Sequence, residues 1–418
     1  MSGCDEKNQK QLDQTEEKEI TGYHWLLFGI CFLANVFGGT VSTLMSVYLP
    51  VAANDLLGKT NVDFNFVSAY VNSVFIFGWA IGGIAWGFLS DRFGRSQAMI
   101  ISIGSFGIFT ILTGFTNSWL LVMMCRFFSG FGVGGILVIT PTLLSEVWPL
   151  KTRSIFIGIL SIGFPVGIFS SGLIDLFVSN WHQAFMIGVV PLTLSILCIF
   201  LVSESKEWQL TKEVNVNIRT KPSAFNLTYR QDLTVATLTF GAMLIGLWAI
   251  FSWLPSWVQN LLQEGDGQRE RGIAMMFMGA GGLLGGFFSG WLSNAIGHRK
   301  AMMLCFGICF IMSFLLFKLN TTFSILIYIE IALLAIFFGA SQGVLSGYIP
   351  ELFPPSIRAT ATGLSFNIGR FVTASVVFFV GALVVTLGGY GNAIFIFSLV
   401  FLVGLVATYY SREPQIKK

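Results

Sequence analysis

Charged residues are scarce in this 418-residue chain. Only 11% of its residues are Asp, Glu, Lys or Arg, whereas a soluble domain usually carries about 25%. A surface that faces water on all sides cannot be built from so few charges. The net charge of +3 at pH 7 is small, and no nucleic-acid partner is expected.

The residues that usually mark enzymes are equally few. The three histidines are scattered without the spacing of metal ligands, and no Gly-Lys-Ser/Thr sequence occurs. The glycine clusters at 132–134 and 279–282 lie inside apolar stretches, whereas a phosphate-binding loop follows a strand and opens a helix. We therefore expect neither an enzyme nor an ATP-driven pump, with no cofactor and no bound metal.

Apolar sequence, by contrast, is abundant. Hydrophobic residues make up 54% of the chain and include 42 Phe. Stretches of about 20 apolar residues, long enough to cross a bilayer as a helix, occur repeatedly. They predict an all-α integral membrane protein embedded in the lipid bilayer. The predicted spans are 24–50, 65–90, 97–116, 119–142, 153–178 and 183–203, then 233–258, 272–295, 301–317, 322–348, 358–385 and 391–410.

Two motifs occur twice, in the same order and about half a chain apart. The stretch GFLSDRFGR at 87–95 returns as GWLSNAIGHRK at 290–300, and EVWPLKTR at 146–153 returns as ELFPPSIR at 351–358. Two different motifs repeated at one offset are hard to obtain by chance. The chain is therefore predicted to form two pseudo-symmetric bundles of six transmembrane helices each.

The positions of Lys and Arg predict the orientation. They concentrate in the loops on one side of the predicted spans, together with both chain ends, and the positive-inside rule places that side in the cytosol. The short loops suit a bacterial inner membrane. The predicted organisation is a cytosolic tail at 1–22, a six-helix bundle at 23–203, a cytosolic linker at 204–232, a second bundle at 233–410 and a cytosolic tail at 411–418.

The repeated motifs resemble the signature loops of the major facilitator superfamily, and the match spans nearly the whole chain. RFFSGFGVG at 126–134 resembles its fourth-helix motif, and 146–153 resembles a loop of its sugar-porter and organic-ion branches. SESKEW at 203–208 is similar to the segment after their sixth helix, with both prolines replaced. The resemblance implies a secondary active transporter whose two bundles rock about one substrate site near the middle of the membrane.

Charged residues in these loops are candidates for a gate. Ion pairs among them would hold helix ends together, and opening toward the cytosol would break some of these pairs. Asn294 replaces Asp91 in the second copy, so the gate should be stronger in the first half. The alternative is that the charges only set topology and cap helices. The candidates are Asp91, Arg92, Arg95, Glu146, Arg153, Glu351 and Arg358.

Ionisable residues at membrane depth are costly and mark candidate functional sites. From the helical rise, Arg126 is expected roughly 10 Å and Glu330 roughly 12 Å below the outer surface. Arg126 is a candidate substrate ligand, and a role in bonding neighbouring helices is equally open. Glu330 is the candidate proton-coupling group, because a carboxylate there can alternate between its neutral and ionised forms. The alternative for Glu330 is a permanent pair with Arg126.

Arg370 carries the most specific hypothesis. The stretch at 358–370 resembles helix 11 of the aromatic-acid, sialate-type and organic-anion carriers, and this resemblance ties Arg370 to anionic substrates. A guanidinium is always charged and grips a carboxylate with two parallel hydrogen bonds. We expect anion binding, with a structural ion pair as the alternative. The other candidate substrate-binding residues are Asn367, Asn35, Trp248 and Gln342.

The sequence as a whole predicts a carrier that moves a small organic anion, a carboxylate, by alternating access and proton symport. Na⁺ is the alternative coupling ion, and a monomer is expected. Two other functions stay open. One is an uncharged-sugar porter, in which Arg370 would hold an unpaired charge near the midplane; the other is a non-transporting nutrient receptor that kept the carrier fold.

Overall fold

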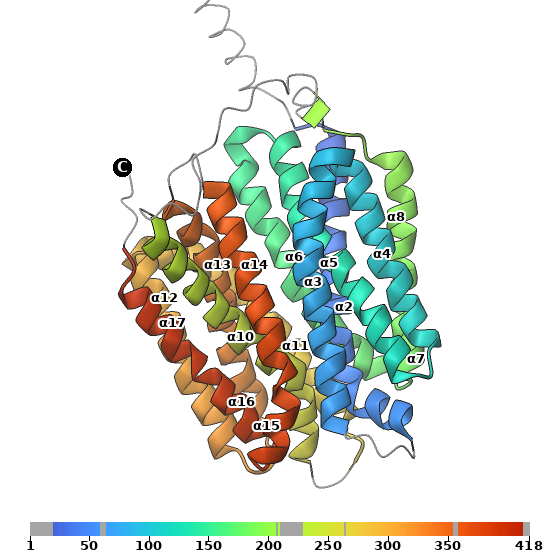
Figure 1. Cartoon of the computed structure of the whole chain (residues 1–418), viewed down its shortest axis with the longest axis vertical. Coiled ribbons are helices and arrows are strands. Elements are labelled where there is room, and N and C mark those ends of the chain that lie inside the picture. The colour runs from blue at the N-terminus through green and yellow to red at the C-terminus, as the bar shows by residue number, and fades with distance from the viewer. Residues whose placement is uncertain are drawn as a thin grey trace, which may run out of the picture.

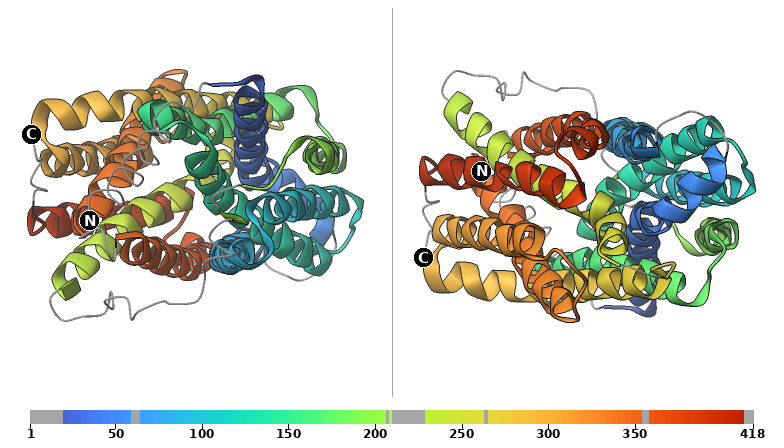
Figure 2. Two further views of the ribbon diagram at one scale, coloured as in Figure 1. Left: turned by 90° about the horizontal axis from the view of Figure 1, so that it is seen from above. Right: turned by 90° about the horizontal axis from the view of Figure 1, so that it is seen from below.

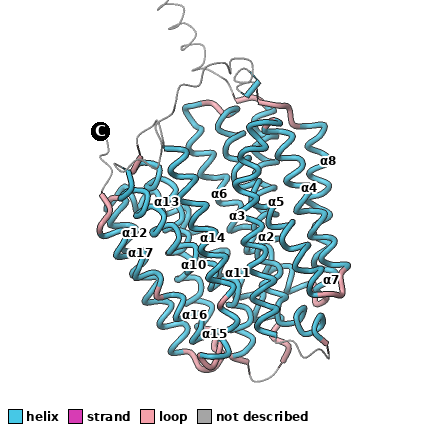
Figure 3. Tube along the Cα trace, viewed as in Figure 1, coloured by secondary structure: helices cyan, strands magenta, loops and turns pink. Residues whose placement is uncertain are grey.

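The structure is a bundle of membrane-length helices (Figure 1). It is a computed structural model that describes residues 20–58, 64–205, 208–209, 229–262, 265–353 and 358–412. Within these residues every regular element is helical (Figure 3), and twelve helices are long and apolar enough to cross a membrane. The predicted all-α fold with twelve spans is confirmed. Most of both predicted tails and of the linker lies outside the described residues.

The first six spans form the N-half. They are α2 (Gly22–Leu57), α3 (Phe64–Phe93), α4 (Arg95–Phe115), α5 (Trp119–Val147), α6 (Leu150–Phe177) and a sixth assembled from α7 (Trp181–Ala184), η1 (Phe185–Gly188) and α8 (Val189–Leu201). Most of these helices run past the predicted spans, because backbone hydrogen bonds continue into polar residues beyond the apolar stretch.

The other six spans form the C-half. They are α10 (Arg230–Asn260), α11 (Gln268–Ile296), α12 (His298–Phe314) continued by η3 (Leu315–Leu319), α13 (Leu326–Glu351), α14 (Arg358–Phe378) followed by α15 (Val380–Thr386), and α16 (Tyr390–Ser398) followed by α17 (Val400–Tyr409). Helix α13 begins four residues later than predicted. Its start is delayed by the loop at 320–324, in which Phe323 is the one apolar residue.

The repeated motif makes the same tight turn in both halves. Gly94 has φ 114° between α3 and α4, and Gly297 has φ 86° between α11 and α12. Residues with a side chain rarely adopt these values, whereas glycine does so at no steric cost. The internal repeat seen in the sequence is therefore a repeat of backbone conformation.

The two halves lie side by side (Figure 2). The described chain begins and ends at the same end of the bundle, which we call the terminal face; the opposite end is the distal face (Figure 1). Toward the distal face, α6 of the N-half packs backbone to backbone on α11 of the C-half. A Cβ atom on Gly172 would lie 2.4 Å from the carbonyl oxygen of Gly272, and one on Gly279 would lie 2.4 Å from the backbone nitrogen of Phe169.

Toward the terminal face the same two helices diverge. A Cβ atom on Gly158 of α6, or on Gly286 or Gly290 of α11, would meet no atom within 4 Å. The neighbouring Phe287 is exposed. The halves are thus closed against each other at the distal face and separated at the terminal face.

Candidate substrate-binding site

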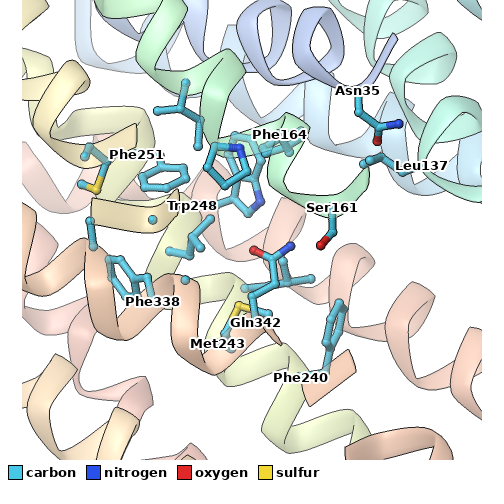
Figure 4. A pocket seen from close by; sticks show the side chains of 18 of the residues that line it. Asn35, Leu137, Ser161, Phe164, Phe240, Met243, Trp248, Phe251, Phe338 and Gln342 are labelled. Carbon is cyan, nitrogen blue, oxygen red and sulfur yellow. The ribbon is translucent and has the colours of Figure 1, made fainter. Parts of the chain in front are cut away.

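A cavity lies between the two halves in the middle of the bundle. It has about 1110 Å³ of open space, its mouth included, and both halves contribute to its wall (Figure 4). Its lining residues come from α2, α3, α5 and α6 on one side and from α10, α11, α13 and α14 on the other. A site shared by both halves is what a carrier that rocks between two openings requires.

Aromatic rings form much of the wall. Trp79 of α3 meets Trp248 of α10 across the halves, with ring centroids 5.2 Å apart and nearly perpendicular planes. Phe164 of α6 stacks on Trp79 at 5.7 Å. Trp248 was predicted as a substrate contact and does line the cavity. Trp79 and Phe164 escaped prediction, because aromatic residues are too common in this chain to stand out.

Arg370 lies at the edge of this aromatic wall. Its guanidinium carbon is 5.8 Å from the ring of Trp79 and 5.9 Å from the ring of Phe240, so it sits between the two halves. Its Nη1 donates a hydrogen bond to Oδ1 of Asn367 at 3.2 Å. Among the described residues no carboxylate lies within ion-pair distance of it. The structural ion pair held open as an alternative is therefore not formed with any described residue.

Polar groups are few on the cavity wall. Asn35 lines it but is buried, and its Nδ2 donates to the Cys31 carbonyl oxygen at 2.8 Å and to Thr140 Oγ1 at 2.9 Å. Ser161 and Gln342 contribute the other uncharged polar side chains (Figure 4). Of the described residues that line the cavity, Arg370 alone carries a charge.

Two candidate substrate ligands lie elsewhere. Asn367 is not part of the cavity wall; it accepts the hydrogen bond that orients Arg370. Arg126 is 1% exposed and donates to the carbonyl oxygens of Val41, at 2.9 Å, and Ser42, at 3.4 Å. These bonds tie α5 to α2. The helix-bonding alternative is the one that these contacts show, and Arg126 is not among the described residues that line the cavity; a substrate role for Arg126 stays a prediction.

Glu330 lies nearer the distal face than predicted. Helix α13 begins at Leu326, so Glu330 is four residues into it, or about 6 Å. Its Oε2 accepts a hydrogen bond from Asn320 Nδ2 at 2.7 Å. The pair with Arg126, which was left open as the alternative, is not formed, because Arg126 is bonded to α2 instead. The predicted depth is corrected; the coupling role stays a prediction.

The gate candidates of the N-half form one network at the terminal face. Arg95 Nη1 lies 2.5 Å from Asp91 Oδ1, and its Nε lies 3.0 Å from Glu146 Oε1. The backbone nitrogen of Arg95 donates to Glu204, which caps α4. Both ion pairs are intact although the halves are separated at this face. These two pairs are therefore not among those that opening at this face would break, since all three residues belong to one half.

The remaining gate candidates do not join this network. Arg92 lies over the ring of its neighbour Phe93, at 5.7 Å, and Arg153 Nε donates to the Trp148 carbonyl oxygen at 3.4 Å. In the C-half, Glu351 Oε2 lies 3.6 Å from His298 Nε2. The side chain of Arg358 lies outside the described part of the structure. Whether any of these residues gates transport stays a prediction.

Sequence reasoning missed one buried ion pair. From the helical rise, Asp175 is expected at the outer end of its helix, in contact with water. Asp175 does lie near the distal end of α6, but its side chain is fully buried, and its Oδ1 lies 3.6 Å from Nη2 of Arg271, which is 1% exposed. The sequence does not reveal this pair, because Arg271 belongs to the other repeat and lies in an otherwise polar stretch.

Two six-helix halves around a shared central cavity define a class of protein, the membrane carriers that alternate between two openings. In the part of the chain that the structure describes, no group of three or more His, Cys, Asp or Glu side chains could hold a metal ion.

A family model of the Major Facilitator Superfamily matches residues 27–377, with a second match at 272–418. The chain belongs to the major facilitator superfamily; it is a transporter and not an enzyme. The cis,cis-muconate transport protein of Acinetobacter baylyi is 28% identical over 371 residues, which cover 86% of this chain and 87% of that protein. The niacin transporter of the same organism is 27% identical over 438 residues, 97% of each chain.

The fold is also that of a solved carrier. The inward-open conformation of the xylose transporter from E. coli superposes with a TM-score of 0.79 at 15% identity, covering 94% of this chain and 98% of that one. At this identity the likeness shows the fold alone.

Proposed function

We propose that this carrier moves a small organic carboxylate, and that Arg370 binds the carboxylate group. One observation carries the proposal: the only charged side chain among the described residues of the cavity wall is a cation without a carboxylate partner. A charge at membrane depth is costly. An anionic substrate would offset that cost with charge-assisted hydrogen bonds.

Planar, unsaturated acids fit the rest of the cavity best. The rings of Trp79, Trp248 and Phe164 offer flat apolar surfaces, and Trp79 and Phe164 are already stacked at an interplanar angle of 30°. The relatives include transporters for cis,cis-muconate, niacin and benzoate, all of them planar acids. Arg370 would hold the carboxylate while the planar body lies against the rings.

The sugar-porter alternative is disfavoured. A sugar presents many hydroxyl groups, yet Asn35, Ser161 and Gln342 are the only uncharged hydrogen-bonding side chains among the described lining residues apart from Trp79 and Trp248. Both N–H donors of the Asn35 side-chain amide are also used within the protein. A receptor without transport would show binding but no counterflow.

The terminal face is proposed to be cytosolic, with the distal face outside and the chain in a bacterial inner membrane. Arg92, Arg95, Arg153, Arg230, Arg299, Lys300 and Arg412 stand near the terminal face, against Arg269, Arg271 and Lys318 near the distal face. This bias supports the orientation. The boundaries at 23–203 and 233–410, and a monomeric carrier, are part of the same proposal.

Counterflow in proteoliposomes tests the proposed substrate class. Vesicles loaded with excess unlabelled benzoate, nicotinate or cis,cis-muconate are expected to accumulate the matching labelled acid, and vesicles loaded with D-xylose are expected to accumulate no labelled xylose. Xylose counterflow without acid counterflow would establish the sugar porter. Binding of an acid without counterflow of any compound would favour the receptor.

Proton coupling belongs to the proposal, and Glu330 is the group that the sequence predicts to carry it. Glu330→Gln keeps the side-chain size and the contact with Asn320 while removing the charge. If the prediction holds, the variant loses accumulation driven by an acidic exterior but keeps carboxylate exchange. Uptake is measured with and without an imposed pH gradient, beside Glu270→Gln as the control. Undiminished pH-driven accumulation would remove Glu330 from the coupling mechanism.

A further inference from the structure

The ion pair between Asp175 and Arg271 joins the two halves at the distal face. Asp175 lies near the end of α6 in the N-half, and Arg271 lies in the first turn of α11 in the C-half. Of the six ion pairs found among the described residues, the other five each lie within one half. Opening the distal face must therefore separate this pair and no other of the six.

The pair is completely withdrawn from water. Asp175 is 0% and Arg271 is 1% exposed, and the closest approach of their charged atoms is 3.6 Å. Neither oxygen of the Asp175 carboxylate accepts a hydrogen bond from a described residue. Burying a carboxylate with so little compensation is costly. The carboxylate is held in this place mainly by the charge of Arg271.

Among the described residues, Arg271 makes hydrogen bonds that the Asp175 carboxylate lacks. Its Nη1 donates to Gln259 Oε1 at 2.8 Å and to the Asp266 carbonyl oxygen at 2.7 Å. These bonds survive if Asp175 loses its charge, so the arginine keeps its position while the attraction between the halves disappears. The pair is therefore asymmetric: the carboxylate is the member whose charge decides whether the halves attract.

The other ionisable groups around Asp175 come from two more elements. They are Tyr48 of α2, whose hydroxyl donates to the Val178 carbonyl oxygen at 2.5 Å, and Asp266 in the loop before α11. Gln268 of α11 adds an uncharged contact, with its Nε2 donating to the Asp175 carbonyl oxygen at 2.5 Å. The negative charge of Asp266 opposes the ionised form of Asp175, whereas Arg271 favours it.

We propose that Asp175 and Arg271 form an outer gate that is released by a proton. When the exterior is acidic, protonation of Asp175 removes the attraction that holds α6 on α11, and the distal face opens to the side that is rich in protons. When Asp175 is ionised, the pair draws the halves together and the distal face closes. The proposal uses the outward orientation of the distal face given above, but it does not depend on the identity of the substrate.

The gate is tested by measuring the separation of the halves at the distal face without substrate. Spin labels are attached at Asn117 of the N-half and Thr321 of the C-half, both exposed in distal-face loops, after replacement of the native cysteines. Lowering the pH from about 8 to about 5 is expected to raise the ratio of open to closed molecules roughly tenfold, a typical coupling between two sites. Asp175→Asn is expected to be open to the same extent at both pH values.

A matched control separates the gate from other acidic groups at the same face. Asp55 pairs with His182 at 3.2 Å, but both residues belong to the N-half, so Asp55→Asn should respond to pH as the unmodified protein does. Asp175→Glu should also keep the response, because it keeps a carboxylate.

Two results would overturn the gate. The first is an unmodified protein whose label separation does not change with pH, which decides the matter even if Asp175→Asn fails to fold. The second is an Asp175→Asn variant that still opens on acidification. Arg370→Ala should keep the response to pH, because the label separation is measured without substrate. A wrong substrate assignment would therefore leave this result unchanged, whereas a wrong gate assignment would not.

Discussion

Replacing Arg370 with alanine is expected to lower carboxylate uptake by about 100-fold or more, since truncating one member of a buried charge pair costs several kcal/mol. Arg370→Lys should recover little of this loss. A lysine ammonium is a point charge and cannot reproduce the two parallel hydrogen bonds of a guanidinium. Initial uptake rates of labelled benzoate and cis,cis-muconate in proteoliposomes give the comparison.

Arg269→Ala is the matched control for this prediction. Arg269 is exposed at the distal face and does not line the cavity, so its loss should leave uptake within about twofold, as expected for surface substitutions that touch no special feature. If Arg370→Ala and Arg370→Lys transported as well as this control, Arg370 would not bind the substrate.

Gly279→Ala is expected to hold the distal face open and to lower the rate of transport by roughly tenfold or more. The added Cβ would lie 2.4 Å from the backbone nitrogen of Phe169, so α6 and α11 could not keep their present contact. Overpacking of this kind costs about 1–3 kcal/mol. Because the clash arises only when the halves meet at the distal face, it should shift the equilibrium between the two openings and leave folding within each half intact.

The same spin labels and the same uptake assay measure this effect. Gly307→Ala serves as the control, because a Cβ atom there would meet only Leu405, at an ordinary 3.8 Å. The account of the interface between the halves would be contradicted if Gly279→Ala showed the label separation and the uptake of the control.

Much of the fold could be predicted from the sequence. Long apolar stretches fix the number of spans, because a helix satisfies all of its backbone hydrogen bonds within one stretch of about 20 residues in a bilayer. The motif at 87–95 and its copy at 290–300 also predicted the repeat, which Gly94 and Gly297 reproduce as turns with positive φ. The apolar stretches and the repeated motif are both properties of the sequence itself, so they can be recognised without knowing which helices are in contact.

The contacts between helices could not be predicted in the same way. Arg126 and Glu330 lie at equivalent positions of the repeat, yet each has its own partner, Val41 in one case and Asn320 in the other. These partners depend on the direction of each side chain and on where α13 begins. Neither can be derived from the spacing of the two repeats. Asp175 and Arg271 likewise come from different halves, and only the packing of α6 on α11 brings them together.

If the Arg370 guanidinium receives a carboxylate in the cavity, the purified protein should distinguish an acid from its neutral amide. Trp79 and Trp248 line the cavity, so quenching of tryptophan fluorescence can report binding of benzoate and of benzamide to the purified protein. The unmodified protein is predicted to bind benzoate at least about tenfold more tightly than benzamide, as expected for a desolvated charge-assisted pair, and Arg370→Gln is predicted to bind the two equally. A preference for benzoate that persists undiminished in Arg370→Gln would contradict the account.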